Sequence, residues 1–312
     1  MSKGLSIALL PLARRRMGGV KTVSSGALNR TIPQDEYVER CISYQREAER
    51  QHYSMPRVVD GLWRCEGLST TLGKYRLPEN TLADPRLPPA AWGITHVGYG
   101  AASTEFAHFD DAKLHEIART CCHPDNQGFF YEGIGSIVRI YEPGIFKFMC
   151  GMLGLIPKGA PPGPDRDGFY TKFFTAFDDE QARLIVHGYG RLVGFSKISV
   201  YAAIGEAMQL PQHRVEACVQ GIAFAFAMMN AEEMPRLLEN SAIEYPDPVR
   251  RAFQTGLTYG MVFCDWFAPG FLAAWKPAGP LEEKLIGHAR REAEINRQAG
   301  RIPAFALHEA LP

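Results

Sequence analysis

The chain has 312 residues, of which 46% are hydrophobic and 22% are charged, the proportions of a folded globular protein and not of a disordered one. Its 34 basic residues balance its 34 acidic residues, so the charge does not indicate a nucleic-acid partner. A chain of this length can bury a large core in one or two domains.

Seven cysteines are spread along the chain, an odd number without a Cys-x-x-Cys pair. This usage is typical of reduced, buried thiols and predicts a cytoplasmic protein. The adjacent residues Cys121, Cys122 and His123 have the chemistry of metal ligands. Neighbouring residues on a helix point about 100° apart, however, so we expect buried thiols at a helix end instead.

Residues 1–34 predict a flexible N-terminal segment. Within it, residues 5–13 are mostly apolar, but they contain Pro11 and precede three arginines where a secretory signal would carry a cleavage site. We interpret them as a short docking segment, with a membrane-surface anchor as the alternative. No stretch reaches the roughly 20 uncharged residues that a spanning helix needs, so we expect no stable membrane span.

Residues 35–92 predict an N-terminal helix followed by an irregular cover. The helix starts near Asp35 and places Tyr37, Cys41 and Tyr44 on one face, at helical spacing. Residues 56–92 hold five prolines and three glycines. They predict an irregular covering segment with room for one short strand pair.

A glycine-centred motif recurs from residue 93 onward. Its first glycine is at positions 98, 133, 188, 221 and 256, at intervals of 35, 55, 33 and 35 residues. The long interval contains the Pro/Gly-rich insertion PKGAPPGPDRDG at 157–168, which we interpret as a loop. A period near 34 residues is typical of helix-pair solenoids. The pattern predicts an all-α fold for residues 93–300, with stacked helix-pair repeats in an α-solenoid or α/α-toroid-like arrangement.

Local signals agree with helices in this region. Pro211 and Pro248 suit first-turn positions, and Asp247 is the expected N-cap before the second. A glycine in the middle of a helix costs about 1 kcal/mol relative to alanine. Five glycines at one helical phase therefore predict that neighbouring helices approach the backbone closely.

The positions around each glycine predict a stripe of side chains along one wall of the stacked helices. Glu132 and His187 immediately precede Gly133 and Gly188. Arg191 lies four residues after His187, and Tyr259 lies four residues after Thr255, the residue before Gly256, so they share the same helical face. A few convergent polar groups among large apolar ones are typical of a ligand pocket. We therefore interpret Glu132 and His187 as an acid–base pair. The expected substrate-binding residues are Arg191, Tyr189, Tyr259, Phe195, Phe224, Met228 and Phe263.

Each of these residues also has a purely structural interpretation. Glu132 could form an ion pair with Arg191 or Arg139, because charged groups are rarely buried unpaired. His187 could be a hydrogen-bonded core histidine, and Tyr189 could be a core aromatic residue. Convergence on one helical face is what favours the functional interpretation.

Two aspartate pairs, Asp110 with Asp111 and Asp178 with Asp179, each follow a phenylalanine. Paired carboxylates can hold Mg²⁺ against a diphosphate, as in class I terpene cyclases, and this is the alternative metal site. Both pairs lie where helices should begin, so we favour helix capping and expect no metal. The sequence has no Walker loop, Rossmann glycine fingerprint or Gly-x-Ser-x-Gly motif, and we expect no organic cofactor.

Four segments between residues 93 and 275 contain, in this order, a Tyr-Glu-Gly motif after two phenylalanines, a Gly-Tyr-Gly-Arg motif and a run of small residues. They are Gly128-Phe-Phe-Tyr-Glu-Gly-Ile-Gly, His187-Gly-Tyr-Gly-Arg-Leu-Val-Gly-Phe, Gln220-Gly-Ile-Ala-Phe-Ala-Phe-Ala and Arg251-Ala-Phe-Gln-Thr-Gly. They resemble a bacterial family catalogued as domain-of-unknown-function family 1702. The chain departs from that family in having His187 where a glutamine is usual, and in the insertion at 157–168.

Members of this family often occur near genes for specialised metabolites, including enediyne polyketides. The resemblance therefore implies a role in natural-product assembly, without specifying a reaction. It implies a polar role for position 187 only to the extent that a histidine can replace the usual glutamine.

The leading hypothesis is a cytoplasmic, cofactor-independent protein of natural-product biosynthesis that binds or converts a hydrophobic polyketide- or isoprenoid-like intermediate in a helix-lined pocket. If it is catalytic, it is a cyclase- or isomerase-type enzyme. One alternative is a non-catalytic helical-repeat scaffold that binds a biosynthetic partner protein. A second is a Mg-dependent isoprenoid cyclase. A scaffold should expose the polar stripe, an enzyme should enclose it, and a cyclase should direct both aspartate pairs into one cavity.

Overall fold

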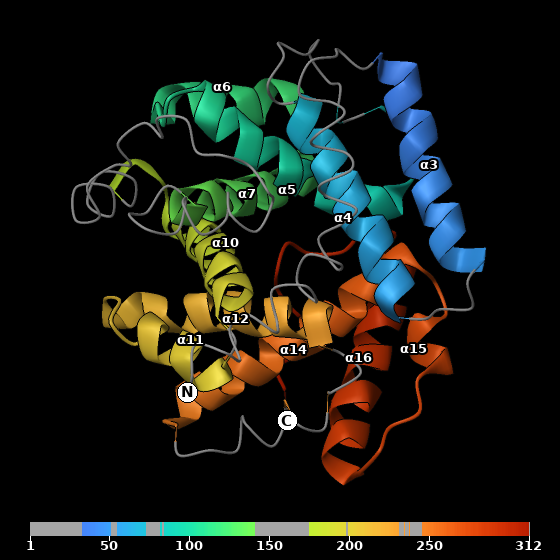
Figure 1. The fold of residues 1–312 in the computed structure, drawn as a ribbon, viewed down its shortest axis with the longest axis vertical. Coiled ribbons are helices and arrows are strands. Elements are labelled where there is room, and N and C mark those ends of the chain that lie inside the picture. Colours follow the sequence, from blue (N-terminus) through green and yellow to red (C-terminus); the bar gives the residue numbers. More distant parts are fainter. Residues whose placement is uncertain are drawn as a thin grey trace, which may run out of the picture.

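The structure, a computed structural model, describes residues 33–50, 55–72, 82, 84–140, 175–197, 199–230, 234, 237 and 245–311. All regular secondary structure in these residues is helical, which confirms the all-α class (Figure 1). The helices are α3 (Gln34–Arg50), α4 (Met55–Leu72), α5 (Pro89–Phe106), α6 (Asp111–Cys121), η2 (Pro124–Asn126), α7 (Gln127–Ile140), α10 (Asp179–Ser196), α11 (Val200–Ala207), α12 (Gln212–Asn230), α14 (Asp247–Phe267), α15 (Phe271–Ala274) and α16 (Pro280–Ala299).

Aspartates cap two of these helices, as expected. The Asp110 carboxylate accepts a hydrogen bond from the backbone N–H of Lys113 at the start of α6. The Asp178 carboxylate accepts one from the N–H of Gln181, whose side chain accepts from the Asp178 N–H in return. This reciprocal pair is a capping box, which satisfies two of the unpaired donors at the start of α10.

The start of α14 differs slightly from the prediction. Pro248 lies in the first turn as expected, but Asp247 is already helical and Pro246 holds the N-cap position. Pro246 brings no side-chain acceptor, and Asp247 forms an ion pair with Arg250 one turn along the helix. Asp247 therefore acts as a first-turn carboxylate near the positive end of the helix dipole, not as the cap.

Helix α4 corrects the expectation of an irregular cover over residues 56–92. Residues 55–72 form an 18-residue helix, and α5 begins at Pro89. Pro56 is in the first turn of α4, where the N–H that proline lacks has no partner in the helix. Gly61 lies against the Phe267 ring, so it serves helix packing. In the described part of this region, proline and glycine thus mark helix starts and helix contacts.

Six long helices, α4, α5, α7, α10, α12 and α14, form a series in which each packs on the next. The series closes, because α14 also contacts α4 and α5. At this closure, Phe267 and Phe263 of α14 lie against Gly61 and Gly93. We call this arrangement the helix ring. Helix α3 packs on α4, and α16 packs on α14 (Figure 1).

Glycines form the crossings between successive helices of the ring. A Cβ atom on each of them would lie less than 3.0 Å from a carbonyl oxygen of the preceding helix, closer than real Cβ atoms approach. That oxygen belongs to the residue just before the motif glycine of the preceding helix. The pairs are Gly98 with Glu66, Gly133 with Val97, Gly188 with Glu132, Gly221 with His187 and Gly256 with Gln220. The prediction that these glycines lie inside long helices at helix–helix contacts is confirmed.

A second glycine, two residues after the first, packs in the opposite direction in three of these helices. Each faces a carbonyl oxygen of the following helix. The pairs are Gly100 with Phe130, Gly135 with Ile185 and Gly190 with Cys218. In α12 this position is Ala223, whose methyl group meets Gly256 of α14. Paired helices therefore approach each other through small residues on both sides, where an added side chain would meet backbone.

The shorter helices do not recur in the same way. Helices α6, α11 and α15, which follow α5, α10 and α14, have 11, 8 and 4 residues. What recurs is the glycine crossing of the long helices and not a helix pair of constant size. The predicted loop at 157–168 and residues 1–32 lie outside the described residues.

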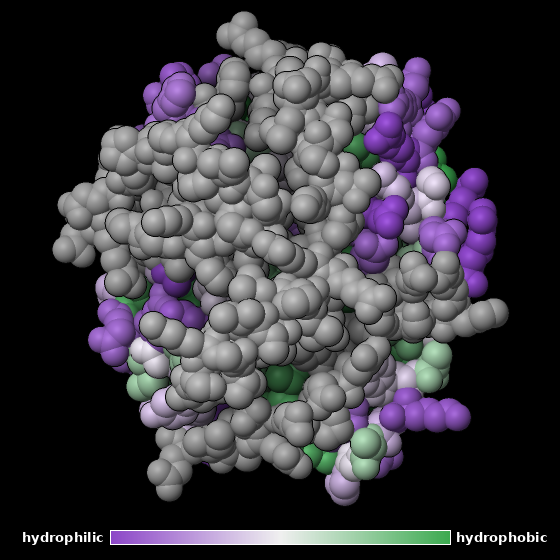
Figure 2. Space-filling view, in the orientation of Figure 1, coloured by the Kyte–Doolittle hydropathy of each residue, from purple (hydrophilic) through white to green (hydrophobic). Residues whose placement is uncertain are grey.

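Many charged side chains lie on the outer surface, although Glu132, Arg139 and Arg191 are buried. Hydrophilic side chains gather along α3 at the right-hand edge of the molecule (Figure 2), while Tyr37 and Cys41 on its inner face are buried as predicted. Cys121 and Cys122 are buried at the end of α6, and no disulfide joins described residues. No helix in the described part of the chain is long and apolar enough to cross a membrane.

The crossing at Gly221 leads to a first prediction. A methyl group there would collide with the His187 carbonyl oxygen of α10, so α12 would have to move outward. We expect Gly221→Ala to destabilise the fold by about 1–3 kcal/mol, the usual cost of overpacking. Urea denaturation measures this change.

The matched control is Gly287→Ala, because Gly287 is also helical, in α16, and has open space where its Cβ would be. This variant should keep its stability or gain up to about 1 kcal/mol from helix propensity. Equal stability of Gly221→Ala and the unmodified chain would contradict the close contact between α10 and α12.

Candidate functional site

The proposed acid–base pair lies at the crossing of α7 and α10. Both residues immediately precede a crossing glycine, so the same contact that brings the helices together places their side chains in one interior region. The Nδ1 atom of His187 is 3.4 Å from Oε1 of Glu132. Glu132 is 0% exposed and His187 is 1% exposed. The two side chains therefore meet in the interior, as an acid–base pair would have to.

Arg191, one turn after His187, carries the positive charge of this cluster. Its guanidinium donates two hydrogen bonds to the Glu66 carboxylate, at 3.0 and 2.8 Å, and one to the Ser136 hydroxyl, at 2.9 Å. Its Nε is 2.9 Å from Oε1 of Glu132. The predicted ion pair between Glu132 and Arg191 is therefore present, and Glu66 shares the same guanidinium.

Hydrogen bonding in the cluster is incomplete. Neither Glu132 carboxylate oxygen has a hydrogen-bond partner among the described residues, and His187 Nδ1 and Arg191 Nε also lack one there. The short distance between Arg191 and Glu132 is thus an ion-pair contact whose N–H does not point at the oxygen. Leaving a buried polar atom unsatisfied costs about 1–3 kcal/mol. The geometry therefore leaves donors and acceptors available to another molecule.

Burial shifts the pKa values of the pair in opposite directions. Burial raises the pKa of Glu132 to about 7, although the positive charge of Arg191 lowers it in part. Burial also holds the pKa of His187 well below its ordinary 6.5, and the charges of Arg183 and Arg191 act in the same direction. Near neutral pH, His187 is therefore neutral, and Glu132 can both give and take a proton.

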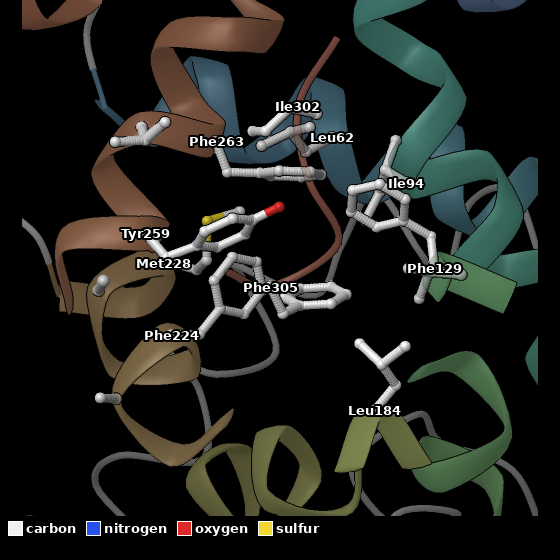
Figure 3. Packing of buried hydrophobic residues seen from close by; sticks show 14 of the residues in the cluster. Leu62, Ile94, Phe129, Leu184, Phe224, Met228, Tyr259, Phe263, Ile302 and Phe305 are labelled. Carbon is white, nitrogen blue, oxygen red and sulfur yellow. The ribbon is translucent and has the colours of Figure 1, made fainter. Parts of the chain in front are cut away.

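Aromatic side chains from four helices surround the residue that fills the centre of the helix ring, Phe305. The ring centroid of Phe305 is 4.1 Å from that of His187, 5.2 Å from those of Phe129 and Tyr259, and 5.4 Å from that of Phe224. Figure 3 shows Phe305 between the aromatic residues of α12 and α14 on one side and Phe129 on the other. The predicted apolar wall therefore exists, and a residue from another segment packs against it.

Phe305 belongs to residues 301–311, which we call the inner segment. Its trace enters the middle of the molecule from the end of α16 (Figure 1). The Tyr259 hydroxyl donates to the Pro303 carbonyl at 2.7 Å, and Arg183 donates to the carbonyls of Ala304 and Phe305, both at 3.2 Å. Side chains of α10 and α14 thus hold the inner segment by its carbonyl oxygens.

The structure separates the predicted substrate-binding residues into groups. Tyr259, Phe224 and Phe263 form the aromatic wall around Phe305, and Met228 is buried beside Cys264. Arg191 belongs to the polar cluster, and Phe195 lies under its guanidinium, with the Trp63 ring against its edge. Six of the seven residues are thereby connected to the ring interior or its polar cluster.

Tyr189 is placed differently. Its hydroxyl accepts a hydrogen bond from Arg139 at 3.0 Å, and that arginine forms an ion pair with Glu206 at 2.6 Å. Lys197 completes the group, 2.8 Å from the same carboxylate. This second network lies along α7, α10 and α11 and involves none of the ring contacts of Phe305. Tyr189 therefore fits its alternative interpretation as a core aromatic residue better than a role in substrate binding.

The aspartate pairs lie at helix starts. Asp110 and Asp178 are the N-caps described above, and Asp111 and Asp179 are the first residues of the same helices. Among the described residues, no group of three or more histidines, cysteines, aspartates and glutamates is arranged to hold a metal ion. The capping interpretation of both pairs is confirmed.

Three residues of the site were not predicted from the sequence. Glu66 was overlooked because α4 was expected to be irregular, although Cys65-Glu66-Gly67-Leu68 repeats the order of Tyr131-Glu132-Gly133-Ile134. Phe305 was overlooked because the inner segment has no helical periodicity, and its contacts are with residues far away in the sequence. Arg183 was missed for the same reason, since its partners are Ala304 and Phe305.

A shallow pocket of about 220 Å³ lies elsewhere, where α3, α5, α14 and α16 meet. Asp265 and Arg297 form an ion pair at 2.7 Å in its wall. The Asp265 carboxylate also accepts the N–H of Leu272, so its two oxygens are engaged within the protein. The remaining lining residues are Gln45, Pro89, Ala90, Val262, Trp266, Pro269, Ala293 and Asn296.

Comparison of the chain with protein-family models, curated proteins and solved structures finds no match. The resemblance to domain-of-unknown-function family 1702 therefore stays a prediction based on the quoted motifs. Those motifs are the segments that make the crossings of α7, α10, α12 and α14, and they include Glu132, His187 and Arg191.

The burial of Glu132 leads to a second prediction, on pH. Its pKa is about 7 in the folded chain against an ordinary 4.5, so between these values the folded state binds more protons than the unfolded state. Its contribution to stability is present at low pH and is lost as the pH rises through about 7, at up to about 1.4 kcal/mol per pH unit. Glu132→Gln should remove this loss.

The measurement is the free energy of unfolding between about pH 5 and pH 8. The shift of His187 acts with the opposite sign, because its contribution is lost as the pH falls below 6.5. His187 is present in both proteins, so the difference between Glu132→Gln and the unmodified chain isolates Glu132. That difference should grow in favour of the variant as the pH rises. A constant difference would show that Glu132 stays ionised beside Arg191.

Proposed function

We propose that the chain is a cytosolic protein of natural-product assembly, which binds a hydrophobic intermediate inside the helix ring and converts it by proton transfer. Glu132 and His187 are the acid–base pair, and Arg191 and Tyr259 orient the substrate. The natural-product role follows from the motif resemblance alone. The site itself follows from one observation: the buried Glu132 carboxylate and Nδ1 of the buried His187, neither with a hydrogen-bond partner among the described residues, lie 3.4 Å apart beside an aromatic wall.

The proposed chemistry needs only protons. Ionised Glu132 accepts a proton from a carbon or hydroxyl of the bound intermediate and returns it at another position, while neutral His187 donates a hydrogen bond from a ring N–H to the atom where negative charge develops. A double bond moves or a ring closes without net oxidation or reduction, so the reaction is an isomerisation or a cyclisation. Exclusion of water by the surrounding side chains strengthens each electrostatic contact in the site.

The alternatives fit the described residues less well. A scaffold that binds a partner protein along the polar stripe would expose it, whereas Glu132, His187, Arg191 and Tyr259 are all buried. An isoprenoid cyclase would direct its aspartate pairs toward one cavity, whereas Asp110 and Asp178 cap separate helices. The scaffold remains an outcome of the experiment below.

The third prediction tests the acid–base roles. In the organism that makes the protein, the gene is replaced by Glu132→Gln or by His187→Ala, and metabolites are compared with those of a deletion strain. Each purified variant should unfold cooperatively near the melting temperature of the unmodified chain. Each strain should lose the compound that the deletion strain lacks, because removing a general acid or base typically costs about 100- to 10,000-fold in rate.

The control is Glu294→Gln, an exposed carboxylate of α16 that pairs with Arg297 outside the ring. This strain should make the compound at the normal level. Full production in both site variants would contradict proton transfer and favour the scaffold. Unfolding of both would show that Glu132 and His187 serve the structure.

A further inference from the structure

The inner segment occupies the space in which a hydrophobic ligand would bind. Phe305 is 4% exposed, and its ring contacts five other rings from α7, α10, α12 and α14. His187 is the closest of the five, and their planes are inclined by 33°. An aromatic ring therefore already lies against one member of the acid–base pair.

The inner segment is held in the way a ligand is held. The carbonyls of three successive residues, Pro303, Ala304 and Phe305, accept hydrogen bonds from the side chains of Tyr259 and Arg183. Phe305 has a φ of 51°, in the left-handed region that a bulky residue rarely adopts and that costs energy. The contacts of the Phe305 side chain with its aromatic neighbours, and the hydrogen bonds to the three carbonyls, offset this strain.

Two anchors on α16 flank the inserted part. On one side, Gly300 ends α16 in the left-handed conformation, with open space where a Cβ atom would be. On the other side, the Glu292 carboxylate accepts the N–H groups of His308 and Glu309, at 2.8 and 2.7 Å. Residues 302–307 therefore form a short strap between two fixed points, and they can leave the ring interior without detaching from α16.

Phe305 does not satisfy the polar groups next to it. A phenyl ring carries no hydrogen-bonding atom, and the Glu132 carboxylate and His187 Nδ1 remain unpartnered within the described chain. A carbonyl oxygen on an aromatic ligand could accept a hydrogen bond from protonated Glu132 or from an Nδ1–H of His187, while the ligand ring makes the same contacts as the Phe305 ring. The protein's own segment thus matches the shape of the space but not its polarity.

We propose that Phe305 marks the subsite for an aromatic ring of the ligand, and that residues 302–307 withdraw from the helix ring when this ligand binds. The inference rests on the proposed function, because it takes the ring interior as the ligand site. It narrows the hydrophobic intermediate to one with a planar aromatic ring and an adjacent carbonyl oxygen. The aromatic ring of the ligand stacks on His187, and its carbonyl oxygen accepts a hydrogen bond from Glu132 or His187. Withdrawal of the strap also releases the Tyr259 hydroxyl and the Arg183 guanidinium as donors.

The fourth prediction uses acetophenone, an aryl ketone, and cyclohexyl methyl ketone, which has the same carbonyl on a saturated ring. Calorimetric titration compares the unmodified chain with Phe305→Ala. The variant should bind acetophenone at least tenfold more tightly, because the competing side chain is gone. It should bind the saturated ketone several-fold more weakly than acetophenone, because aromatic pairing is lost. Phe271→Ala is the control, since Phe271 is equally buried in α15 outside the ring, and should bind acetophenone like the unmodified chain.

Hydrogen exchange tests the movement in the unmodified chain and does not depend on a variant that folds. Acetophenone should increase amide exchange in residues 302–307, and leave it unchanged at His308, Glu309 and in α12. Unchanged exchange in 302–307 would overturn the withdrawal of the strap. Binding of neither ketone to a folded Phe305→Ala, or equal binding of both, would overturn the aromatic subsite.

These outcomes separate the two proposals. Loss of product in Glu132→Gln without ketone binding would overturn the aromatic subsite and support the acid–base roles. Ketone binding in Phe305→Ala together with full production by Glu132→Gln would support the subsite and overturn proton transfer.

Discussion

The contact between a glycine and the carbonyl oxygen of the neighbouring helix is the constraint on which the rest of the structure depends. It sets the helix spacing at each crossing of the ring, because a Cβ at the glycine would overlap backbone. The carbonyls of Glu66, Glu132 and His187 take part in three of these contacts. The backbone of each polar residue is therefore positioned by helix packing, independently of the interactions among the side chains.

This constraint explains why the glycines could be predicted from the sequence and the polar cluster only in part. A shared phase at near-constant intervals indicates helix crossings without knowledge of the fold. Since Glu132 and His187 precede crossing glycines on consecutive ring helices, their meeting also followed from spacing. The role of α4 did not, because its proline and glycines resemble those of an irregular segment until their neighbours are known. Because α4 was not predicted, neither the role of Glu66 nor the closure of the helix ring could be predicted.

The position of the inner segment inside the helix ring could not be predicted from the sequence, for a different reason. The inner segment is irregular, and its position is set by Tyr259, Arg183 and Glu292, residues that precede it by between 16 and 122 positions. No periodicity connects such residues. The aromatic wall was predicted as a binding surface from α12 and α14, and the structure shows that surface covered by Phe305. A pattern can indicate an apolar surface, but only packing shows what covers it.

Glu66 also explains why Glu132 is not simply one half of a buried ion pair. Arg191 directs two hydrogen bonds to Glu66, which is partly exposed, and it approaches Glu132 through a poorly directed Nε. Burial raises the pKa of Glu132 to about 7, because the charge and hydrogen bonding of Arg191 offset only part of the cost of burying the ionised carboxylate. The cluster is neutral when Glu132 is protonated and negative when it is ionised. Burial thereby keeps the Glu132 carboxylate on α7 able to exchange a proton near neutral pH, although Arg191 lies beside it.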